Sequence, residues 1–467
     1  MNSNRSRLSY RARKRRQKRI ILVICTIAAF FLVCAGLLFM IQGSGSIDWF
    51  KKDPVSTEDS TESNAVGSTG ADEQTAASGE ETSSEESTEP ETEPVPAVVT
   101  IEDVWANDTR TPVEARGVYL SANEANKAST REYVIELLDK TEINAVVIDV
   151  KDDEGYLTVN LDIPLAEEIG ALGALTFDSA DALKAVLDEF KAHGAYLIAR
   201  IAAFRDDVLT QAKPECSLWW KAAWGGTIYV DNQGYHWLDP GDETVRQYLL
   251  DVSMAAVELG FDEIQYDYVR FPTTYIGRVE YYGHTGYYLE DNVTYNEEGA
   301  QLRKDAITSY IEYVCRELVP QGVFVSADVY GTIIGSPEDS GNVGQDYASL
   351  SKWLDYICPM VYPSHYTSPI YGVQYPDTQP YTIVNGAMLD SIKELSVLTD
   401  AGEHCAIVRP WMQTFTASWL GEGRYITYGG TQLRQQINGV YEAGYSEWIL
   451  WSSSADYSKY RDGIMNK

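Results

Sequence analysis

From about residue 100 to the end of the chain, short apolar runs alternate with longer amphipathic stretches. Eight of the apolar runs have the length and the β-branched and aromatic content of strands. These eight cover residues 116–122, 144–152, 195–204, 262–271, 322–331, 356–363, 405–415 and 446–453. Several of the stretches between them open on a capping Ser, Thr or Asp, as helices do. Eight β/α repeats predict an α/β fold, the (β/α)8 TIM barrel, with a doubly wound parallel sheet as the alternative.

Two long insertions interrupt this pattern. Residues 206–240 follow the third predicted strand, and residues 273–299 follow the fourth. Both insertions are rich in Trp or Tyr, and both come after the carboxyl end of a strand. Barrel enzymes build their sites from the loops at that end. We therefore expect a site near these insertions.

The first 41 residues have a different composition. Residues 1–19 hold nine Arg and Lys and no acid, and residues 20–41 form an uncharged apolar run of 22 residues. Such a run is long enough to cross a bilayer as a helix. It predicts a retained membrane anchor with the basic tail in the cytoplasm and the rest of the chain outside the cell. A cleaved signal peptide is the alternative.

Residues 42–99 are rich in Ser, Thr, Glu, Gly and Pro. A segment of this kind buries too little apolar surface to fold, which predicts a disordered acidic linker. The folded domain then spans residues 100–467. The chain carries a formal net charge of −32, and the basic residues cluster in the tail rather than on the domain. Nucleic acid is therefore not expected as a partner.

In a barrel, alternate strand residues point inward and outward. The apolar positions of five predicted strands fix the outward rows, such as Ile264, Tyr266 and Tyr268 in the fourth, and leave polar residues inside. The predicted inward set is Asp149, Lys151, Arg200, Gln265, Asp267, Asp328, Arg409, Trp411 and Gln413. Most of them come late in their strands, near the expected mouth. A purely structural network of Asp267, Arg200 and Arg409 is the alternative to a functional cluster.

Carboxylates, cations and aromatic rings together suit a polyhydroxylated substrate, because rings stack on sugars and charged groups hold hydroxyls. Paired carboxylates are also the minimal apparatus of glycoside hydrolysis. The five histidines lack metal-ligand spacing, and neither a Gly-rich phosphate loop nor a G-x-S-x-G elbow occurs in the sequence. We expect no metal and no cofactor. Arg270, three residues after Asp267, is expected to lower the pKa of that carboxyl.

Four cysteines lie beyond the predicted anchor, namely Cys216, Cys315, Cys358 and Cys405. Their scattered positions predict buried free thiols, with a bridge between Cys358 and Cys405 as the alternative.

Several motifs, in this order along the chain, resemble a bacterial TIM-barrel domain family of unknown function that is described as glycoside hydrolases. They are RGVYLSA, INAVVIDVKDDEGYLTV, YLIARIAAFRDD, the stretch from WLDPGDE to DYVRFP, SADVYG, YICPMVYPSHY and RPWMQTF, and they span most of residues 113–460. The resemblance implies a sugar-cleaving barrel. By analogy with barrel glycosidases, the predicted catalytic residues are Asp267 and Asp328, at the ends of the fourth and fifth strands, together with Asp149.

The residues expected to bind substrate are Lys151, Arg200, Gln265, Arg270, Tyr362, Arg409, Trp411, Gln413 and Trp451. The substrate expected for an anchored extracellular enzyme is a cell-wall or environmental polysaccharide, or a peptidoglycan-type glycan. Two alternatives remain from the sequence: a non-catalytic carbohydrate-binding or wall-associated module, and a scaffolding protein whose barrel merely packs.

Overall fold

The computed structural model describes residues 100–106, 108–220, 226–273, 279–281 and 297–467. The predicted tail, anchor and linker, residues 1–99, lie outside this part of the chain. None of the described helices is long and apolar enough to cross a membrane.

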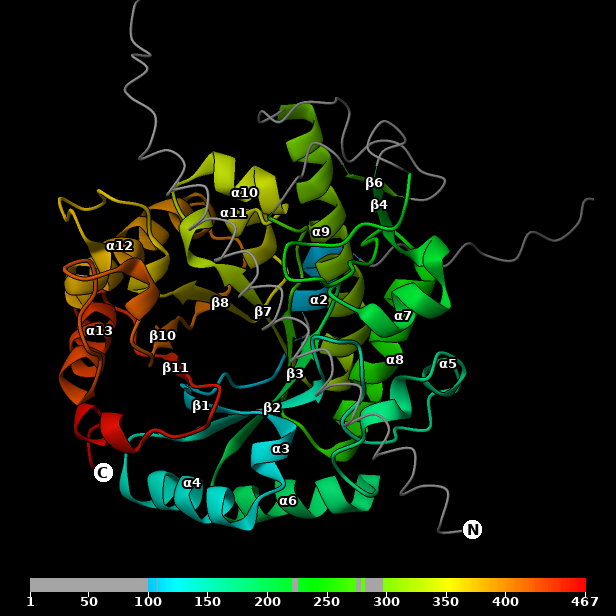
Figure 1. Ribbon diagram of the computed structural model, residues 1–467, viewed down its shortest axis with the longest axis horizontal. Coiled ribbons are helices and arrows are strands. Elements are labelled where there is room, and N and C mark those ends of the chain that lie inside the picture. Colours follow the sequence, from blue (N-terminus) through cyan, green and yellow to red (C-terminus); the bar gives the residue numbers. More distant parts are fainter. Residues whose placement is uncertain (1–99, 107, 221–225, 274–278, 282–296) are drawn as a thin grey trace, which may run out of the picture. The chain divides into compact units, whose positions relative to one another are not determined.

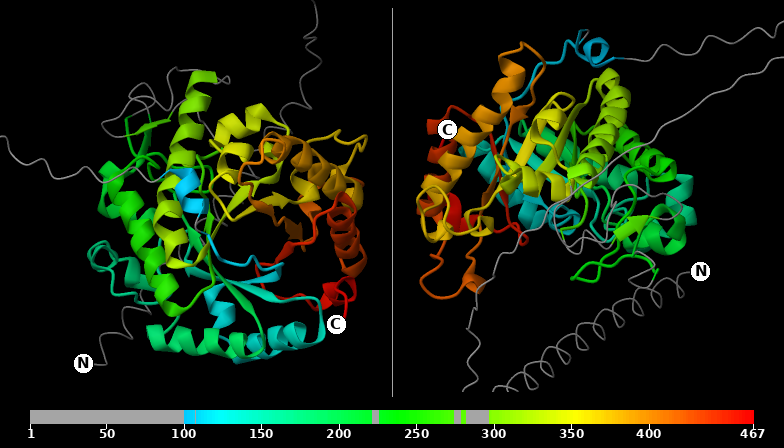
Figure 2. Two further views of the ribbon diagram at one scale, coloured as in Figure 1. Left: turned by 180° about the vertical axis from the view of Figure 1, so that it is seen from behind. Right: turned by 90° about the horizontal axis from the view of Figure 1, so that it is seen from above.

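Parallel strands form a closed barrel in the compact unit of residues 92–467 (Figures 1 and 2). The strands are β1 (Arg116–Leu120), β2 (Ala145–Lys151), β3 (Tyr196–Ala202), β5 (Glu263–Asp267), β7 (Phe324–Tyr330), β8 (Tyr356–Val361), β9 (Ile407–Val408), β10 (Trp411–Gln413) and β11 (Trp448–Trp451). They pair in the order β10, β11, β1, β2, β3, β5, β7, β8, β9, and β10 also pairs with β8, which closes the ring. The predicted (β/α)8 barrel is confirmed.

The seventh barrel strand is split in two. β9 pairs with β8, and β10 pairs with both β8 and β11, so the two pieces together fill one position in the ring. Arg409 and Pro410 separate the pieces, and Pro410 has no N–H to donate to a ladder. All eight predicted strand positions are therefore occupied, the seventh by a broken strand.

Helices surround the barrel (Figure 1). They are α2 (Ile101–Ala106), α3 (Ala122–Ala125), α4 (Ala128–Lys140), α5 (Pro164–Glu168), α6 (Ala180–Ala192), α7 (Asp207–Ala212), α8 (Glu243–Leu259), α9 (Glu297–Leu318), α10 (Pro337–Val343), α11 (Tyr347–Ser351), α12 (Pro380–Thr399) and α13 (Gly430–Ala443). Local sequence sets their ends. Asp242 caps α8 by accepting a hydrogen bond from the Val245 N–H, and Gly260 ends it with a φ of 100°.

The predicted alternation along the strands is confirmed for the packed residues. Outward residues such as Val146, Leu197 and Ile264 belong to the large apolar cluster between strands and helices. Inward residues such as Val147 and Ile198 belong to a second cluster inside the barrel. Burial of this apolar surface, at about 25 cal/mol per Å², is the main stabilising contribution to such a core.

Tyr266 shows how the outward row fixes a helix. Its hydroxyl lies 2.6 Å from the Ser253 hydroxyl of α8, and its ring meets the Tyr310 ring of α9 edge to face at 5.5 Å. The same Tyr310 ring meets Phe204, after β3, at 4.9 Å. These contacts fix β5, and with it Asp267, against two helices.

The alternation of inward and outward side chains is interrupted at two places, at the end of β2 and at the end of β5. The pairing of β2 with β3 shifts register between Asp149 and Lys151, so Lys151 no longer follows the inward row. β5 ends at Asp267, and Tyr268 has a φ of 52°, which bulky residues rarely adopt. The prediction that Tyr268 packs outward against the helices is therefore wrong, because the backbone turns there.

The two predicted insertions contain a small two-stranded antiparallel sheet of β4 (Leu218–Trp220) and β6 (Val279–Tyr281). One strand comes from each insertion. Residues 221–225, 274–278 and 282–296 of these insertions lie outside the described part. The four cysteines beyond residue 100 are free, and Cys216, Cys315 and Cys358 are buried, as predicted.

Candidate active site

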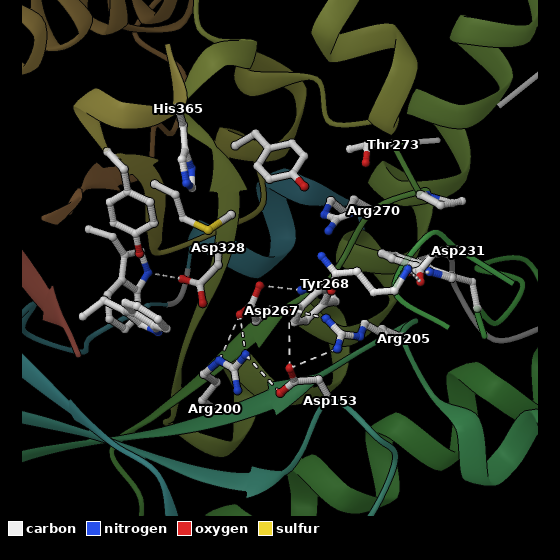
Figure 3. A pocket seen from close by; sticks show the side chains of 18 of the residues that line it. Asp153, Arg200, Arg205, Asp231, Asp267, Tyr268, Arg270, Thr273, Asp328 and His365 are labelled. Carbon is white, nitrogen blue, oxygen red and sulfur yellow. Dashed lines mark hydrogen bonds and ion pairs between the residues drawn. The ribbon is translucent and has the colours of Figure 1, made fainter. Parts of the chain in front are cut away.

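A cavity of about 650 Å³ lies at the carboxyl ends of the barrel strands (Figure 3). Each of several strands contributes side chains from its last residues or from the loop after it. The strand contributions are Tyr119 from β1, Arg200 from β3, Asp267 from β5, Asp328 and Tyr330 from β7, Met360 and Tyr362 from β8 and the residue after it, Trp411 from β10, and Trp451 from β11. Seven of the predicted site residues line this cavity: Asp267, Asp328, Arg200, Arg270, Tyr362, Trp411 and Trp451.

Asp267 is held by Arg200. The Arg200 Nε and Nη2 atoms donate to Asp267 Oδ2 at 3.0 and 2.6 Å, and the Tyr268 N–H donates to Asp267 Oδ1 at 2.6 Å. Charge-assisted hydrogen bonds of this kind are short and hold the carboxylate in a fixed orientation. The expectation that Arg270 is the cation beside Asp267 is wrong: Arg270 forms no ion pair with it, because the turn at Tyr268 separates the two side chains.

Arg200 also reaches a second acid. Its Nη1 donates to Asp149 Oδ1 at 2.7 Å, and the Tyr119 hydroxyl donates to Asp149 Oδ2 at 2.6 Å. Burial raises the pKa of Asp149, while Arg200 opposes the rise. Asp149 is not among the residues that line the cavity. It lies behind Arg200, where it can position the guanidinium, and the geometry gives no support to a direct catalytic role for Asp149.

Asp328 has the opposite electrostatic setting. Only 2% of it is exposed, and the Trp411 Nε1–H donates to its Oδ1 at 2.6 Å. Burial raises the pKa of this carboxyl well above its usual value, and the nearby charge of Asp267 raises it further, against a smaller lowering by the Trp411 hydrogen bond. The cavity thus contains one carboxyl bound to a cation and one that favours its protonated form. Such a difference between neighbouring acids marks acid and base assignments in enzymes.

Lys151 lies outside the cavity, contrary to prediction. Both its side chain and that of Asp206 are fully buried, and Lys151 Nζ lies 2.9 Å from Asp206 Oδ2. Lys151 Nζ also donates to the Ala202 carbonyl at 2.7 Å. The register shift after Asp149 turns Lys151 toward the loop after β3. Gly155 completes this packing, because a Cβ there would lie 2.0 Å from Asp206 Oδ1.

Arg409 belongs to a buried network deeper in the barrel. Its Nη1 donates to both carboxylate oxygens of Glu263 at 2.9 Å, and its Nε donates to Glu447 Oε2 at 2.7 Å. Tyr196 and Ser326 donate to the same Glu263 carboxylate. Arg409 therefore stabilises the barrel interior and does not line the cavity. Of the predicted structural network, only the link between Asp267 and Arg200 is present.

The two predicted glutamines are also buried away from the cavity. Gln265 donates through Nε2 to Cys358 Sγ at 3.4 Å. Gln413 donates to Asp377 Oδ1 at 2.8 Å and accepts from the Ser364 N–H at 3.1 Å. Gln413 thereby fixes the loops after β8 and β10, which are cavity walls. Both residues follow the inward row, but they lie below or behind the surface that a ligand would reach.

Sequence reasoning missed several cavity residues that lie in loops. Asp153 follows β2, and its carboxylate oxygens lie 3.7 Å from Arg200 Nη2 and 3.6 Å from Arg205 Nη2. Burial raises the pKa of Asp153, but Arg200 and Arg205 outweigh this and hold it below its usual value. The motif VKDDEG contains several acids that follow β2, but strand alternation does not predict the direction of side chains in a loop.

One wall of the cavity is aromatic. Phe415 meets Tyr362 at 5.6 Å and Trp451 at 5.7 Å edge to face, and it stacks with Trp419 at 5.7 Å. Trp419 is 65% exposed. His365 lies against Tyr362 and Phe415, and burial lowers the pKa of its imidazole. Flat rings beside carboxyl groups fit the faces of sugar rings, and an exposed indole extends this surface outward.

No cluster of His, Cys, Asp or Glu in the described part of the chain is arranged to hold a metal ion. Carboxyl groups, guanidiniums and aromatic rings are prominent among the side chains that line the cavity.

Comparison with protein families gives one match that covers most of the domain. The model of a family described as "Putative glycosyl hydrolase domain" matches residues 117–457. The chain belongs to this family. The match covers every barrel strand except the first residue of β1, and the family's description supports a glycosidase-like function.

Many solved structures match the chain, and two of them show the range of similarity. A hypothetical protein from Ruminiclostridium thermocellum ATCC 27405 is 32% identical, covering 45% of this chain and 97% of that one, with a TM-score of 0.36. The PgaB (BpsB) glycoside hydrolase domain from Bordetella bronchiseptica is 13% identical, covering 76% of this chain and 100% of that one, with a TM-score of 0.52. At that identity the second likeness supports the barrel fold alone. No curated protein matches the chain.

Proposed function

We propose that this protein hydrolyses glycosidic bonds, with Asp328 as the acid and Asp267 as the carboxylate that attacks or activates water. The observation that carries the proposal is the pair of carboxyls in one cavity with opposite electrostatic settings. Asp328 is buried and its pKa is raised, whereas Arg200 donates two hydrogen bonds to Asp267. Glycoside hydrolysis requires one protonated and one ionised carboxyl at the same linkage.

In this mechanism the Asp328 carboxyl donates its proton to the glycosidic oxygen as the bond from that oxygen to the anomeric carbon breaks. The Asp267 carboxylate either bonds to the anomeric carbon, with water later displacing it, or removes a proton from the water that attacks. Either route adds one water across one glycosidic bond. Arg200 orients Asp267 through two hydrogen bonds, and Asp149 positions Arg200 from behind.

The aromatic wall supports a sugar as the ligand. Phe415, Trp419, Trp451 and Tyr362 surround the side of the cavity next to Asp328. The exposed Trp419 ring extends this wall beyond the carboxyls. A chain of several sugar units would contact both the exposed Trp419 ring and the two carboxyls, which favours a polysaccharide over a single sugar.

We further propose that residues 20–41 anchor the protein in the cell membrane with its N-terminus in the cytoplasm, and that residues 42–99 act as a spacer. The support is the apolar run that follows nine basic residues and the acidic Ser- and Thr-rich composition after it. The catalytic domain would then face a cell-wall or environmental polysaccharide, or a peptidoglycan-type glycan.

The test is a panel of polysaccharides incubated with the wild type, Asp267→Asn and Asp328→Asn, with released reducing ends as the readout. We expect the wild type to cleave at least one polymer and each variant to lose at least about 100-fold in rate, since general acid catalysis alone contributes about 10²–10⁴-fold. Asp188→Asn, on the surface of α6 beside Lys184, is the matched control and should keep full activity.

Unchanged cleavage by Asp267→Asn would refute the assignment. Binding of a polymer without cleavage by any form of the protein would instead favour a carbohydrate-binding module. Proton NMR of the first product distinguishes retention from inversion at the anomeric carbon, and so decides whether Asp267 bonds to the sugar or activates water.

A further inference from the structure

Arg270 is a buried cation that has no carboxylate partner among the residues that the structure describes. It is 7% exposed, and it lines the cavity beside Asp231 and Thr273 (Figure 3). Its Nη1 donates one hydrogen bond, to the Phe271 carbonyl at 2.9 Å. Aromatic rings surround the rest of the guanidinium, with centroids at 4.6 Å for Trp237, 4.6 Å for Tyr330 and 5.2 Å for Tyr268. No Asp or Glu of the described residues forms an ion pair with it.

Other buried cations of the barrel have acidic partners. Lys151 pairs with Asp206, Arg200 with Asp149 and Asp267, and Arg409 with Glu263 and Glu447. Burying a charge without a partner costs several kcal/mol, so buried charges in proteins are nearly always paired. Arg270 departs from this rule at the wall of the cavity, where a ligand can supply the missing anion.

A second guanidinium lies on the same side of the cavity. Arg205 donates through Nη1 to the Tyr268 hydroxyl at 2.6 Å and lies over the Tyr235 ring at 3.5 Å. Its Nε is buried and has no hydrogen-bond partner. Both arginines lie against the Tyr268 ring. We call this part of the cavity, formed by Arg205, Arg270, Trp237, Tyr268 and Tyr330, the arginine lobe.

The acids near the lobe are engaged elsewhere. Asp231 accepts from the Gln233 and Tyr235 N–H groups at 2.8 and 3.0 Å and from Trp237 Nε1 at 3.1 Å, all within its own loop. Asp153 lies 3.6 Å from Arg205 Nη2 but is shared with Arg200. The lobe therefore keeps unused donor capacity, with Arg270 as its main source.

We propose that the arginine lobe binds a carboxylate carried by the glycan, so that the substrate of the site is an acidic polysaccharide. This inference rests on the proposed function and adds the class of sugar. A guanidinium presents paired N–H donors that match the two oxygens of a carboxylate, and the ring faces hold its plane in place. The acidic sugar unit lies in the arginine lobe, and the scissile linkage lies between Asp267 and Asp328.

Binding measurements test the proposal without requiring turnover. Oligomers of polygalacturonate, alginate and hyaluronate carry carboxylates, and denuded peptidoglycan strands carry them on lactyl groups. Each is compared with its carboxyl-reduced, neutral counterpart by isothermal titration calorimetry on the wild type and on Asp267→Asn. We expect at least one acidic glycan to bind about tenfold or more tightly than its neutral counterpart, since hydrogen bonds to charged groups contribute about 1.5–3 kcal/mol.

Variants assign the preference to the lobe. Arg270→Gln should lower the affinity for the acidic form to that for the neutral form and so remove the preference, and Arg270→Lys should restore part of the preference. Arg205→Gln should reduce the preference for the acidic form. Arg246→Gln on α8, where the arginine bonds to the Pro240 carbonyl away from the cavity, is the matched control and should behave as wild type. Melting curves of each variant confirm that it folds.

The two proposals fail separately. If no acidic glycan binds better than its neutral counterpart, or if Arg270→Gln keeps the preference intact, the arginine lobe is not a carboxylate site, whatever is cleaved. If an acidic glycan binds through Arg270 but is never hydrolysed, the lobe stands and the hydrolase assignment fails.

Discussion

Asp328 illustrates, at the scale of one residue, how a catalytic setting affects stability. Its pKa is raised in the folded state, so the folded protein binds this proton more tightly than the unfolded chain does. The contribution of Asp328 to stability is therefore fully present below the unfolded pKa of 3.8 and is lost as the pH rises through the folded value. At neutral pH the buried carboxyl destabilises the protein.

Asp328→Asn should accordingly melt at a higher temperature than the wild type at pH 7–8, while losing activity. Asn keeps the shape and can still accept from Trp411 Nε1 but carries no titrating proton. Each unit by which folding raises the pKa of Asp328 costs the wild type about 1.4 kcal/mol of stability at high pH, and the variant avoids this cost. Thermal melts of both proteins between pH 4 and 8 check this: the advantage of the variant should grow with pH. A variant that is less stable than wild type at every pH would contradict the role given to Asp328.

The pH dependence of activity tests the role of Asp328 through its neighbour Trp411. The acid must be protonated, so kcat/KM should fall as the pH rises through the raised pKa of Asp328. The Trp411 hydrogen bond lowers this pKa. Trp411→Phe should therefore move the falling limb to higher pH. Trp419→Phe changes an exposed ring that does not touch Asp328 and should leave the limb in place. A limb that stays fixed in Trp411→Phe would exclude Asp328 as the acid.

Side chains at the mouth could be predicted only in part from the sequence. Strand alternation placed Asp267, Asp328 and Trp411 correctly, because period two is a geometric property of strands. It could not place Asp153 or Arg205, because they lie in loops. The link between Asp267 and Arg200 was predicted only within the alternative structural network, because the two residues lie far apart in sequence on the neighbouring strands β5 and β3.

At the scale of elements, the break in the seventh strand is the place where a buried cation links several strands. The interruption between β9 and β10 places Arg409 inside the barrel, where Glu263 and Glu447 accept its hydrogen bonds. The Tyr356 ring lies under the guanidinium at 3.6 Å. One cation thus links β5, the seventh strand and the residue before β11.

Arg409→Met should lower the free energy of unfolding by about 3–5 kcal/mol, because it leaves Glu263 buried without its cation. Chemical denaturation monitored by circular dichroism measures the loss. Lys184→Met on α6 breaks an exposed pair with Asp188 and should cost less than about 1 kcal/mol. Equal losses in the two variants would show that the buried network does not stabilise the barrel.

Glu263 also shows what sequence reasoning could have found at this scale. It shares the inward parity of Gln265 and Asp267 but comes first in β5, at the end of the strand away from the cavity. By contrast, the register shift after Asp149 and the positive φ of Tyr268 have no signature in the hydrophobic pattern. Both are set by tertiary packing, and so Lys151 and Tyr268 were predicted on the wrong side.

At the scale of the whole molecule, the number and order of strands followed from the sequence because each β/α repeat is a local unit. The shape of the cavity could not be predicted in the same way, because the cavity is assembled from the ends of strands that are far apart along the chain. The described residues, from 100 onward, form one compact unit. The proposed anchor and spacer precede it in the sequence.

Cell fractionation tests that proposed arrangement. The full chain should sediment with membranes and resist extraction by high salt, whereas residues 92–467 expressed alone should remain in the supernatant. External protease should release the domain from intact cells if it faces outward. A full chain that remains in the supernatant would exclude the anchor, and a domain protected from protease in intact cells would exclude the outward orientation.

The walls of the cavity also equip the protein for optical measurement. Trp237, Trp411, Trp419 and Trp451 all line it, and their positions range from buried to largely exposed. A ligand entering the cavity would exclude water from these indoles and change their emission, with Trp419 as the most responsive. Unlabelled, uncoloured glycans can therefore be titrated by intrinsic fluorescence, and single Trp→Phe variants would report which part of the cavity each one occupies.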